Sequence, residues 1–368
     1  MIPRQWIKKQ AHASIQQLLR YTYTRRWLHF LSQKTRGHSI VFLRCRRILP
    51  DNVLGKKHRD AENPGALFPR QLASLLEEVQ QRLQFLYLGE AISKLRSGKA
   101  LNQSYVVLTF DESFESSINA ALPILEDMNI PATFFVCTKH LQAEHCFMWD
   151  QEVHAITQSI SPNPITVPWM DRQLTTHPPA QATQSANDLI RHLIQLPKEK
   201  REQRIASLKE LSTSELLPSV LDRHVNHQEL VTYAKHSLLS FGSHGHSHHP
   251  MLSMDINTLK AELKQSRIIL DDACGQSYVN VLNFPFGTQK QLSPTLIQNV
   301  MESGFLAALY DGDGVARPGD HLFRLPRLLL SQKTRILETY EIQGLSTALD
   351  EALLVLTGSE SSKGGLSS

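Results

Sequence analysis

The 368-residue chain has no apolar run of the roughly 20 residues that a membrane-spanning helix needs. Its first 30 residues also lack the apolar block of about 7–15 residues found in secretory signals. We therefore expect neither a transmembrane helix nor a signal peptide, and a cytoplasmic location. The only four cysteines, Cys45, Cys137, Cys146 and Cys274, form no Cys-x-x-Cys pair. This scarcity argues against a disulfide framework or a thiolate zinc site and favours a reducing compartment.

Acidic residues are missing from residues 1–50, which carry 11 lysines and arginines. Within this segment, residues 1–34 have apolar side chains at spacings of three and four, the pattern of a basic amphipathic helix. Such a helix could lie on an anionic membrane surface and hold the protein peripherally on the inner face of the membrane. An organellar transit peptide and a helix packed on the main domain are the alternatives. No nucleic-acid-binding motif accompanies the charge, so we expect no nucleic-acid partner.

The rest of the chain alternates short apolar runs with helical patterns. Residues 105–110 and 132–137 are predicted strands that flank a helix at 118–128, which makes a βαβ unit and hence a parallel sheet. After an irregular insertion at 160–185 and a charged helix at 187–211, the alternation resumes. The later predicted strands and helices cover 237–242, 255–273, 278–284, 294–303, 305–310 and 325–330. Repeated strand–helix pairs over about 230 residues favour a (β/α) barrel.

Three predicted strand ends carry residues capable of chemistry. Asp111 and Glu112 follow the strand at 105–110, although either could simply cap the next helix. A loop after the strand at 237–242 contains four histidines, and imidazole is a common zinc ligand. Asn283-Phe284-Pro285-Phe286-Gly287 ends a third strand and suits a pocket wall. Together these ends predict a carboxylate–histidine–histidine metal site beside a second carboxylate, a combination that activates water.

These motifs resemble the polysaccharide deacetylases with a NodB homology domain, carbohydrate esterase family 4. The resemblance rests on Thr109-Phe110-Asp111-Glu112-Ser113, on Pro131–Val136, on His244 and His248 four residues apart, and on Pro285-Phe286-Gly287. It implies a distorted (β/α)7 barrel, here with a basic N-terminal helical extension. It divides the chain into a basic helix and lead-in elements at 1–99, a barrel at 100–345 with an insertion at about 145–235, and a tail at 346–368.

The resemblance also implies an activity and its residues. The protein would be a hydrolase of carbon–nitrogen amide bonds that removes N-acetyl groups from a polysaccharide or a lipid-linked sugar precursor by metal-activated water. Asp111 would be the general base, and Glu112, His244 and His248 would bind a divalent metal, usually zinc. Pro285 and Phe286 would form the substrate and oxyanion wall, with the Phe286 N–H holding the oxyanion.

The sequence departs from the family pattern at several points. Glu112 replaces an aspartate, Asn283 stands where an arginine often orients the base, and the late Leu-x-His motif with the general acid has no clear match. His249 is an alternative to His248 in the histidine pair. These departures leave open a weakened relative that binds carbohydrate without hydrolysing it, and deacylation of a small non-sugar amide is a third possibility.

Overall fold

The computed structural model describes most of the chain between residues 37 and 331. The basic helix predicted at 1–34 and the tail at 346–368 lie outside the described residues. The described ranges are 37–51, 65–142, 148–160, 164–167, 169–170, 173–175, 179–212 and 223–331.

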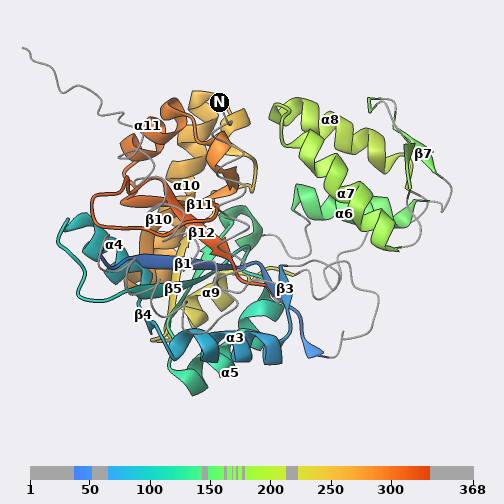
Figure 1. Cartoon of the computed structure of the whole chain (residues 1–368). Helices are drawn as coiled ribbons and strands as arrows, with labels where there is room; N and C mark the ends of the chain where they lie inside the picture. The colour runs from blue at the N-terminus through green and yellow to red at the C-terminus, as the bar shows by residue number, and fades with distance from the viewer. Residues whose placement is uncertain are drawn as a thin grey trace, which may run out of the picture.

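A closed ring of seven parallel strands forms the centre of the protein (Figure 1). The ring closes because β1 pairs in parallel with both β12 and β5. In chain order the ring strands are β1 (Ile40–Cys45), β5 (Tyr105–Phe110), β6 (Ala132–Val136), β9 (Leu239–Ser243), β10 (Tyr278–Thr288), β11 (Ala307–Asp311) and β12 (Leu325–Leu329). A short β4 (Gln84–Phe85) adds to β5 outside the ring. The predicted seven-stranded barrel is confirmed.

The ring begins earlier in the chain than the sequence suggests. β1 lies among the residues assigned to lead-in elements, yet it pairs with β5 along its whole length, from Ile40 opposite Tyr105 to Cys45 opposite Phe110. Nearly sixty residues separate the two strands, and such a distant parallel pairing leaves no local trace in the sequence.

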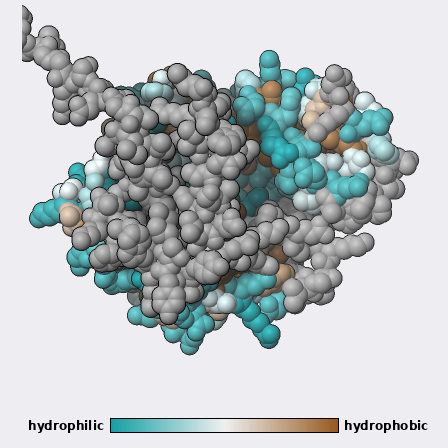
Figure 2. Space-filling model, viewed as in Figure 1, coloured by the Kyte–Doolittle hydropathy of each residue, from teal (hydrophilic) through white to brown (hydrophobic). Residues whose placement is uncertain are grey.

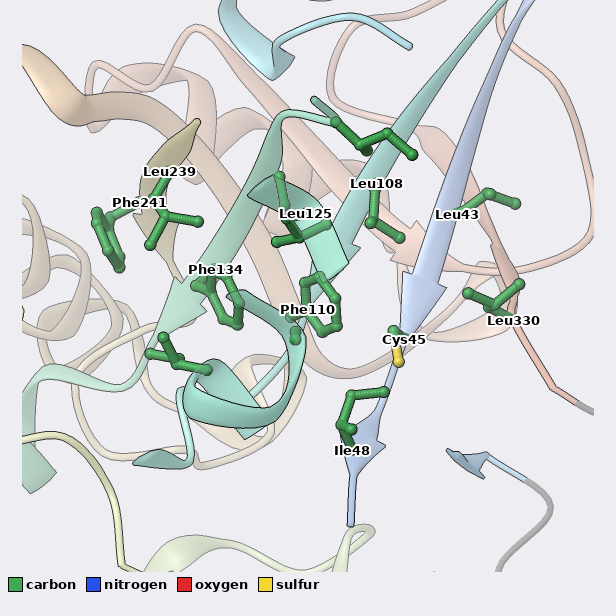
Figure 3. Packing of buried hydrophobic residues seen from close by; sticks show 14 of the residues in the cluster. Leu43, Cys45, Ile48, Leu108, Phe110, Leu125, Phe134, Leu239, Phe241 and Leu330 are labelled. Atoms are coloured by element: carbon green, nitrogen blue, oxygen red, sulfur yellow. The ribbon is translucent and has the colours of Figure 1, made fainter. Parts of the chain in front are cut away.

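The alternation of side chains along each strand separates two apolar layers. In β5, Val106, Leu108 and Phe110 point outward and pack against helices, whereas Tyr105 and Val107 fill the barrel interior. Figure 3 shows the outer layer, where Phe110 and Phe134 lie beside Leu125. Their rings stack with centroids 4.5 Å apart. Truncating one of these buried rings to alanine would cost about 3–5 kcal/mol.

Helices surround the ring on its outer side. The start of α10 is fixed by its N-cap, where the side chain of Asp255 accepts hydrogen bonds from the N–H groups of Asn257 and Thr258. The outer α-helices are α3 (Pro69–Gln80), α5 (Glu115–Met128), α9 (His227–Tyr233), α10 (Ile256–Cys274) and α11 (Pro294–Glu302). The remaining helix, α4 (Leu88–Arg96), instead packs its apolar side chains against the interior layer. Minor elements are β2 (Arg47–Ile48), β3 (Ala66–Leu67), and the 3₁₀ turns Thr138–Leu141, Met251–Ser253, Gly275–Ser277 and Gln289–Gln291.

An insertion between β6 and β9 forms a lobe beside the barrel, at the right of Figure 1. It contains α6 (Trp149–Ser159), the antiparallel pair β7 (Ile165–Thr166) and β8 (Gln173–Leu174), α7 (Pro179–Leu193) and α8 (Lys198–Lys209). The helix predicted at 187–211 is two helices, because Pro197 interrupts it and becomes the N-cap of α8. The lobe has its own apolar core, which includes Val153, Ile156, Leu189, Leu193 and Leu208.

The described surface that is visible in Figure 2 is mostly polar. In Figure 2 hydrophilic side chains dominate the visible described residues of the barrel and the lobe, and the hydrophobic areas are small. In the part of the chain that the structure describes, no helix is both long and apolar enough to cross a bilayer.

Candidate active site

The carboxyl ends of the ring strands bring polar side chains together above the apolar interior. Because side chains alternate along a strand, the residues two places after an inward-facing apolar residue also point inward, at the rim of the barrel. These inward positions are Arg44, Asp111, Cys137, His244, Asn283, Asp311 and Arg327, one at the end of each ring strand. Above them is a cleft of about 490 Å³ whose lining includes Asp111, Glu112, His244, His248 and Phe286.

Asp111 is buried and held by three donors. Arg327 donates from Nη1 to Oδ1 at 2.7 Å and from Nη2 to Oδ2 at 3.1 Å, and Asn283 Nδ2 donates to Oδ1 at 3.1 Å. Burial by itself raises the pKa of the Asp111 carboxyl, but the charges of Arg327, His244 and Arg44 outweigh it and hold that pKa well below its usual range. Asp111 is therefore a carboxylate at neutral pH.

Arg327 is a site residue that the sequence analysis did not identify. Its guanidinium lies entirely inside the protein and also donates to Asp311, which Arg44 contacts from the other side. Arg327 makes the contact with Asp111 in a chain where Asn283 occupies the position at which the family often has an arginine. The available signal was a single arginine inside the apolar run Leu-Pro-Arg-Leu-Leu of β12, at an inward position.

His244 presents one ring nitrogen to the cleft. Its Nδ1 lies 3.0 Å from the main-chain oxygen of Asn283 and 2.9 Å from the side-chain Nδ2 of the same residue, so Asn283 occupies this nitrogen and Nε2 is the one left for the cleft. Burial lowers the pKa of His244 to about 4. A neutral imidazole whose other nitrogen is held by a backbone carbonyl is the arrangement expected of a metal ligand.

His248 is held by the inserted lobe. Its Nδ1 lies 3.1 Å from Asp150 Oδ1, and Trp149 Nε1 donates to its main-chain oxygen at 2.9 Å. Burial alone would lower the pKa of His248, but the carboxylates of Asp150 and Glu112 raise it above its usual value. Asp150 and Trp149 begin α6, and the sequence analysis missed both because nothing in an insertion shows that it folds back onto the histidine loop.

The remaining histidines of the loop have structural partners. His246 Nδ1 lies 2.9 Å from Thr138 Oγ1, and Arg201 Nη2 lies 2.8 Å from His249 Nδ1. The buried carboxylate of Glu262 on α10 accepts hydrogen bonds from the N–H groups of His246 and Ser247. The loop therefore brings His244 and His248 together and turns His249 toward α8.

Glu112 lies at the cleft but not among the most closely grouped metal-binding atoms. Its Oε1 is 4.0 Å from His248 Nε2, and burial raises the pKa of its carboxyl. Its main-chain oxygen lies 2.7 Å from His224 Nδ1. Among the described residues, the three ligand atoms within 4.8 Å of one another belong to Cys137, His244 and His248. Two oriented imidazoles with a sulfur or carboxylate neighbour fit a divalent metal.

The predicted aromatic wall is divided between two surroundings. Phe286 lines the cleft, and its ring lies 4.8 Å from that of His248 and 5.2 Å from that of Trp149, measured between centroids. Pro285 is absent from the cleft lining and instead lines a separate small pocket together with Met251 and Leu252.

Backbone strain is concentrated at the site. Glu112, Ser113, His248 and Phe286 all have positive φ, and the only other described non-glycine residue with positive φ is Asn129, which caps α5. Such conformations cost about 1–3 kcal/mol each, and they are common at functional sites.

Comparisons with known proteins identify a family and a shared fold. The family model described as polysaccharide deacetylase matches residues 98–188 and 218–305. A de-N-acetylase from Aggregatibacter actinomycetemcomitans is similar in structure, with a TM-score of 0.50, 14% identity, and coverage of 82% of this chain and 99% of that one. IcaB from Ammonifex degensii has a TM-score of 0.49 and 16% identity, with coverage of 83% of this chain and 98% of that one. Deacetylase PplD from Streptococcus pyogenes, solved with acetate, has a TM-score of 0.47 and 15% identity, with coverage of 83% of this chain and 97% of that one.

The de-N-acetylase structure, at 14% identity and a TM-score of 0.50, shows a shared fold. No curated protein matches the sequence significantly. The family model covers the strand end with Asp111, the histidine loop and the strand end with Phe286. The chain belongs to the polysaccharide deacetylase family.

Proposed function

We propose that this protein is a metal-dependent hydrolase that removes N-acetyl groups from an N-acetylated glycan or sugar precursor. One observation carries the proposal: the buried carboxylate Asp111, kept ionised by Arg327, shares a cleft with two imidazoles whose Nδ1 atoms are already occupied. An acid–base group beside two oriented nitrogen ligands is the requirement for metal-assisted hydrolysis.

His244 and His248 would hold the metal, together with a third protein ligand beside them. A bound divalent ion would lower the pKa of the attacking water and polarise the amide carbonyl. Zinc suits this set because imidazole is among its common ligands.

Asp111 would accept the proton from the attacking water. Because the pKa of Asp111 is held well below its usual range, this carboxylate is always available but is a weak proton acceptor. The water oxygen bonds to the carbonyl carbon and the carbon–nitrogen bond breaks. The proton held on Asp111 then passes to the leaving nitrogen, giving acetate and a free amine.

The walls of the cleft suit a polar substrate. Phe286 offers an aromatic face on one side, and Thr183, Asn187 and Arg191 of α7 form a polar stripe on the other. These three residues are spaced four apart, so they lie on one face of the helix. We infer that the sugar ring packs against Phe286 and that its hydroxyls face α7.

The test is release of acetate and primary amine from a panel of N-acetylated oligosaccharides. The wild-type protein should release both in equal amounts, lose activity after chelation and regain it with zinc. The control is His244→Ala, which should bind less metal and release no acetate. Oligosaccharide binding without acetate release, by protein shown to contain metal, would instead support a carbohydrate-binding protein.

A further inference from the structure

We propose that Cys137 is the third protein ligand of the metal bound by His244 and His248, in place of Glu112. The metal would then be held by one thiolate and two imidazoles. This assignment rests on the metal dependence in the proposed function, but it concerns binding and can be tested without catalysis.

The register of β6 directs Cys137 into the barrel. Phe134 and Val136 belong to the outer apolar layer and Phe135 to the interior one, so the inward positions are those of Phe135 and, two residues later, Cys137. Cys45, at the end of β1, has the opposite parity and lies in the outer layer. Two buried cysteines at the same rim of the barrel therefore face opposite sides.

The position of the sulfur fits ligation. Cys137 Sγ comes within 4.8 Å of one ring nitrogen of each of His244 and His248, and its thiol donates a hydrogen bond of 3.2 Å to the main-chain oxygen of His244, a bond that metal binding would replace. Zinc–sulfur bonds of about 2.3 Å and zinc–nitrogen bonds of about 2.0 Å in a tetrahedron place the donor atoms roughly 3.3–3.6 Å apart. The three donor atoms would have to approach one another by up to about 1 Å to bind one ion.

Glu112 is less well placed for the same role. Its carboxylate lies 4.0 Å from His248 Nε2, but it is not part of the group within 4.8 Å that includes His244. Position 112 also carries the longer glutamate where the family has aspartate, and the backbone of Glu112 has a positive φ. These features leave the carboxylate at the cleft wall, beside the metal position.

A Cys–His–His set has chemical consequences. Thiolate is a soft donor, so the site should prefer zinc or cobalt to magnesium, calcium or manganese. Three protein ligands also leave one position of a tetrahedral ion open, as in catalytic zinc sites. The absence of a Cys-x-x-Cys pair excludes a site made only of thiolates but does not exclude this mixed one.

Cobalt substitution tests the assignment directly. The full chain, loaded with Co²⁺, should show a near-ultraviolet thiolate-to-cobalt charge-transfer band, with about one Co²⁺ bound per chain. Cys137→Ser should abolish the band and weaken Co²⁺ and Zn²⁺ binding by tenfold or more. Glu112→Gln should keep the band. Cys45→Ser is the matched control, since it removes a buried thiol at the same rim, and it should keep both the band and the affinity.

Several results would overturn the assignment. They are a cobalt-loaded wild-type protein without the band, a Cys137→Ser variant that retains it, and loss of metal in Glu112→Gln together with normal binding in Cys137→Ser. Cys137→Ala is a second truncation if the serine variant fails to fold. The spectrum of the cobalt-loaded wild-type protein tests the assignment even if neither variant folds. Acetate release by a wild-type protein that lacks the band would reject this ligand set alone. A protein that binds no metal would reject both this assignment and the proposed function.

Discussion

Arg327 holds Asp111 with two hydrogen bonds of 2.7 and 3.1 Å that join β12 to β5. The two strands are not neighbours, because β1 lies between them. The contact therefore spans the end of β1 and holds the Asp111 carboxylate at the cleft. An arginine with no exposed side-chain surface supplies the charge that balances Asp111 and Asp311.

Replacing Arg327 should reveal its positioning role. Arg327→Met leaves the buried carboxylate of Asp111 without its main partner, so we expect a loss of about 3–5 kcal/mol in the free energy of unfolding. The pKa of Asp111 should also rise, because burial is then less opposed, and the acid limb of the pH–rate profile should move to higher pH. Urea unfolding and pH profiles measure these effects. Arg327→Lys should restore part of the lost stability and part of the shift in the acid limb. An unchanged pH–rate profile in Arg327→Met would contradict the positioning role of Arg327.

Asp150 should control metal affinity without touching the metal. Asp150→Asn weakens the charged partner of His248 Nδ1, and loss of such a partner typically lowers metal affinity by about 10- to 100-fold. Competition with a chromophoric chelator measures the change. The control is Glu152→Gln on the same helix, whose carboxylate pairs with Lys209 instead. Equal affinities in the Asp150 and Glu152 variants would show that the lobe does not orient His248.

The polar stripe of α7 should affect substrate binding more than chemistry. Asn187 is half-buried in the cleft wall, and Asn187→Leu removes its polar atoms while keeping a similar volume. We expect KM for an N-acetylated oligosaccharide to rise by about 2- to 10-fold, with kcat and metal content little changed. Gln181→Leu replaces an exposed residue of the same helix outside the cleft and should have no effect. A fall in kcat at constant KM would place Asn187 in the chemistry.

Mild acid should destabilise the fold through buried histidines. Burial lowers the pKa of His140 to about 4 and that of His249 to about 3, whereas a histidine in the unfolded chain has a pKa of about 6.5. Between these values the unfolded chain binds more protons than the folded one, so stability falls as the pH drops below about 6.5. The loss should be on the order of 1–2 kcal/mol per histidine between pH 7 and pH 5.

Urea unfolding of the metal-free protein at the two pH values measures this loss. His140→Gln should reduce the difference between them, whereas replacement of the exposed His227 should not. Equal stability at pH 7 and pH 5 would show that these histidines are not kept neutral by the fold.

The sequence was most informative where function depends on local pattern. The strand–helix alternation predicted the parallel barrel, and the strand ends drew attention to Asp111 and the histidine loop. Arg327 and Asp150 were not predictable, because their roles come from tertiary contacts: one from the inward register of a strand, the other from an insertion that folds back on the site. The position of β1 in the ring escaped prediction for the same reason. Cys137 also needed the register of β6 before its sulfur could be placed beside the histidines.

The most direct test of the deacetylase proposal is the yield of acetate and primary amine from an N-acetylated oligosaccharide by zinc-loaded wild-type protein and Asp111→Asn. The proposal predicts equimolar acetate and amine from the wild type. It predicts a loss of about 10²- to 10⁴-fold in rate for the variant, with its metal content unchanged. Metal-loaded wild-type protein that releases neither product, or a variant that works as fast as the wild type, would contradict it.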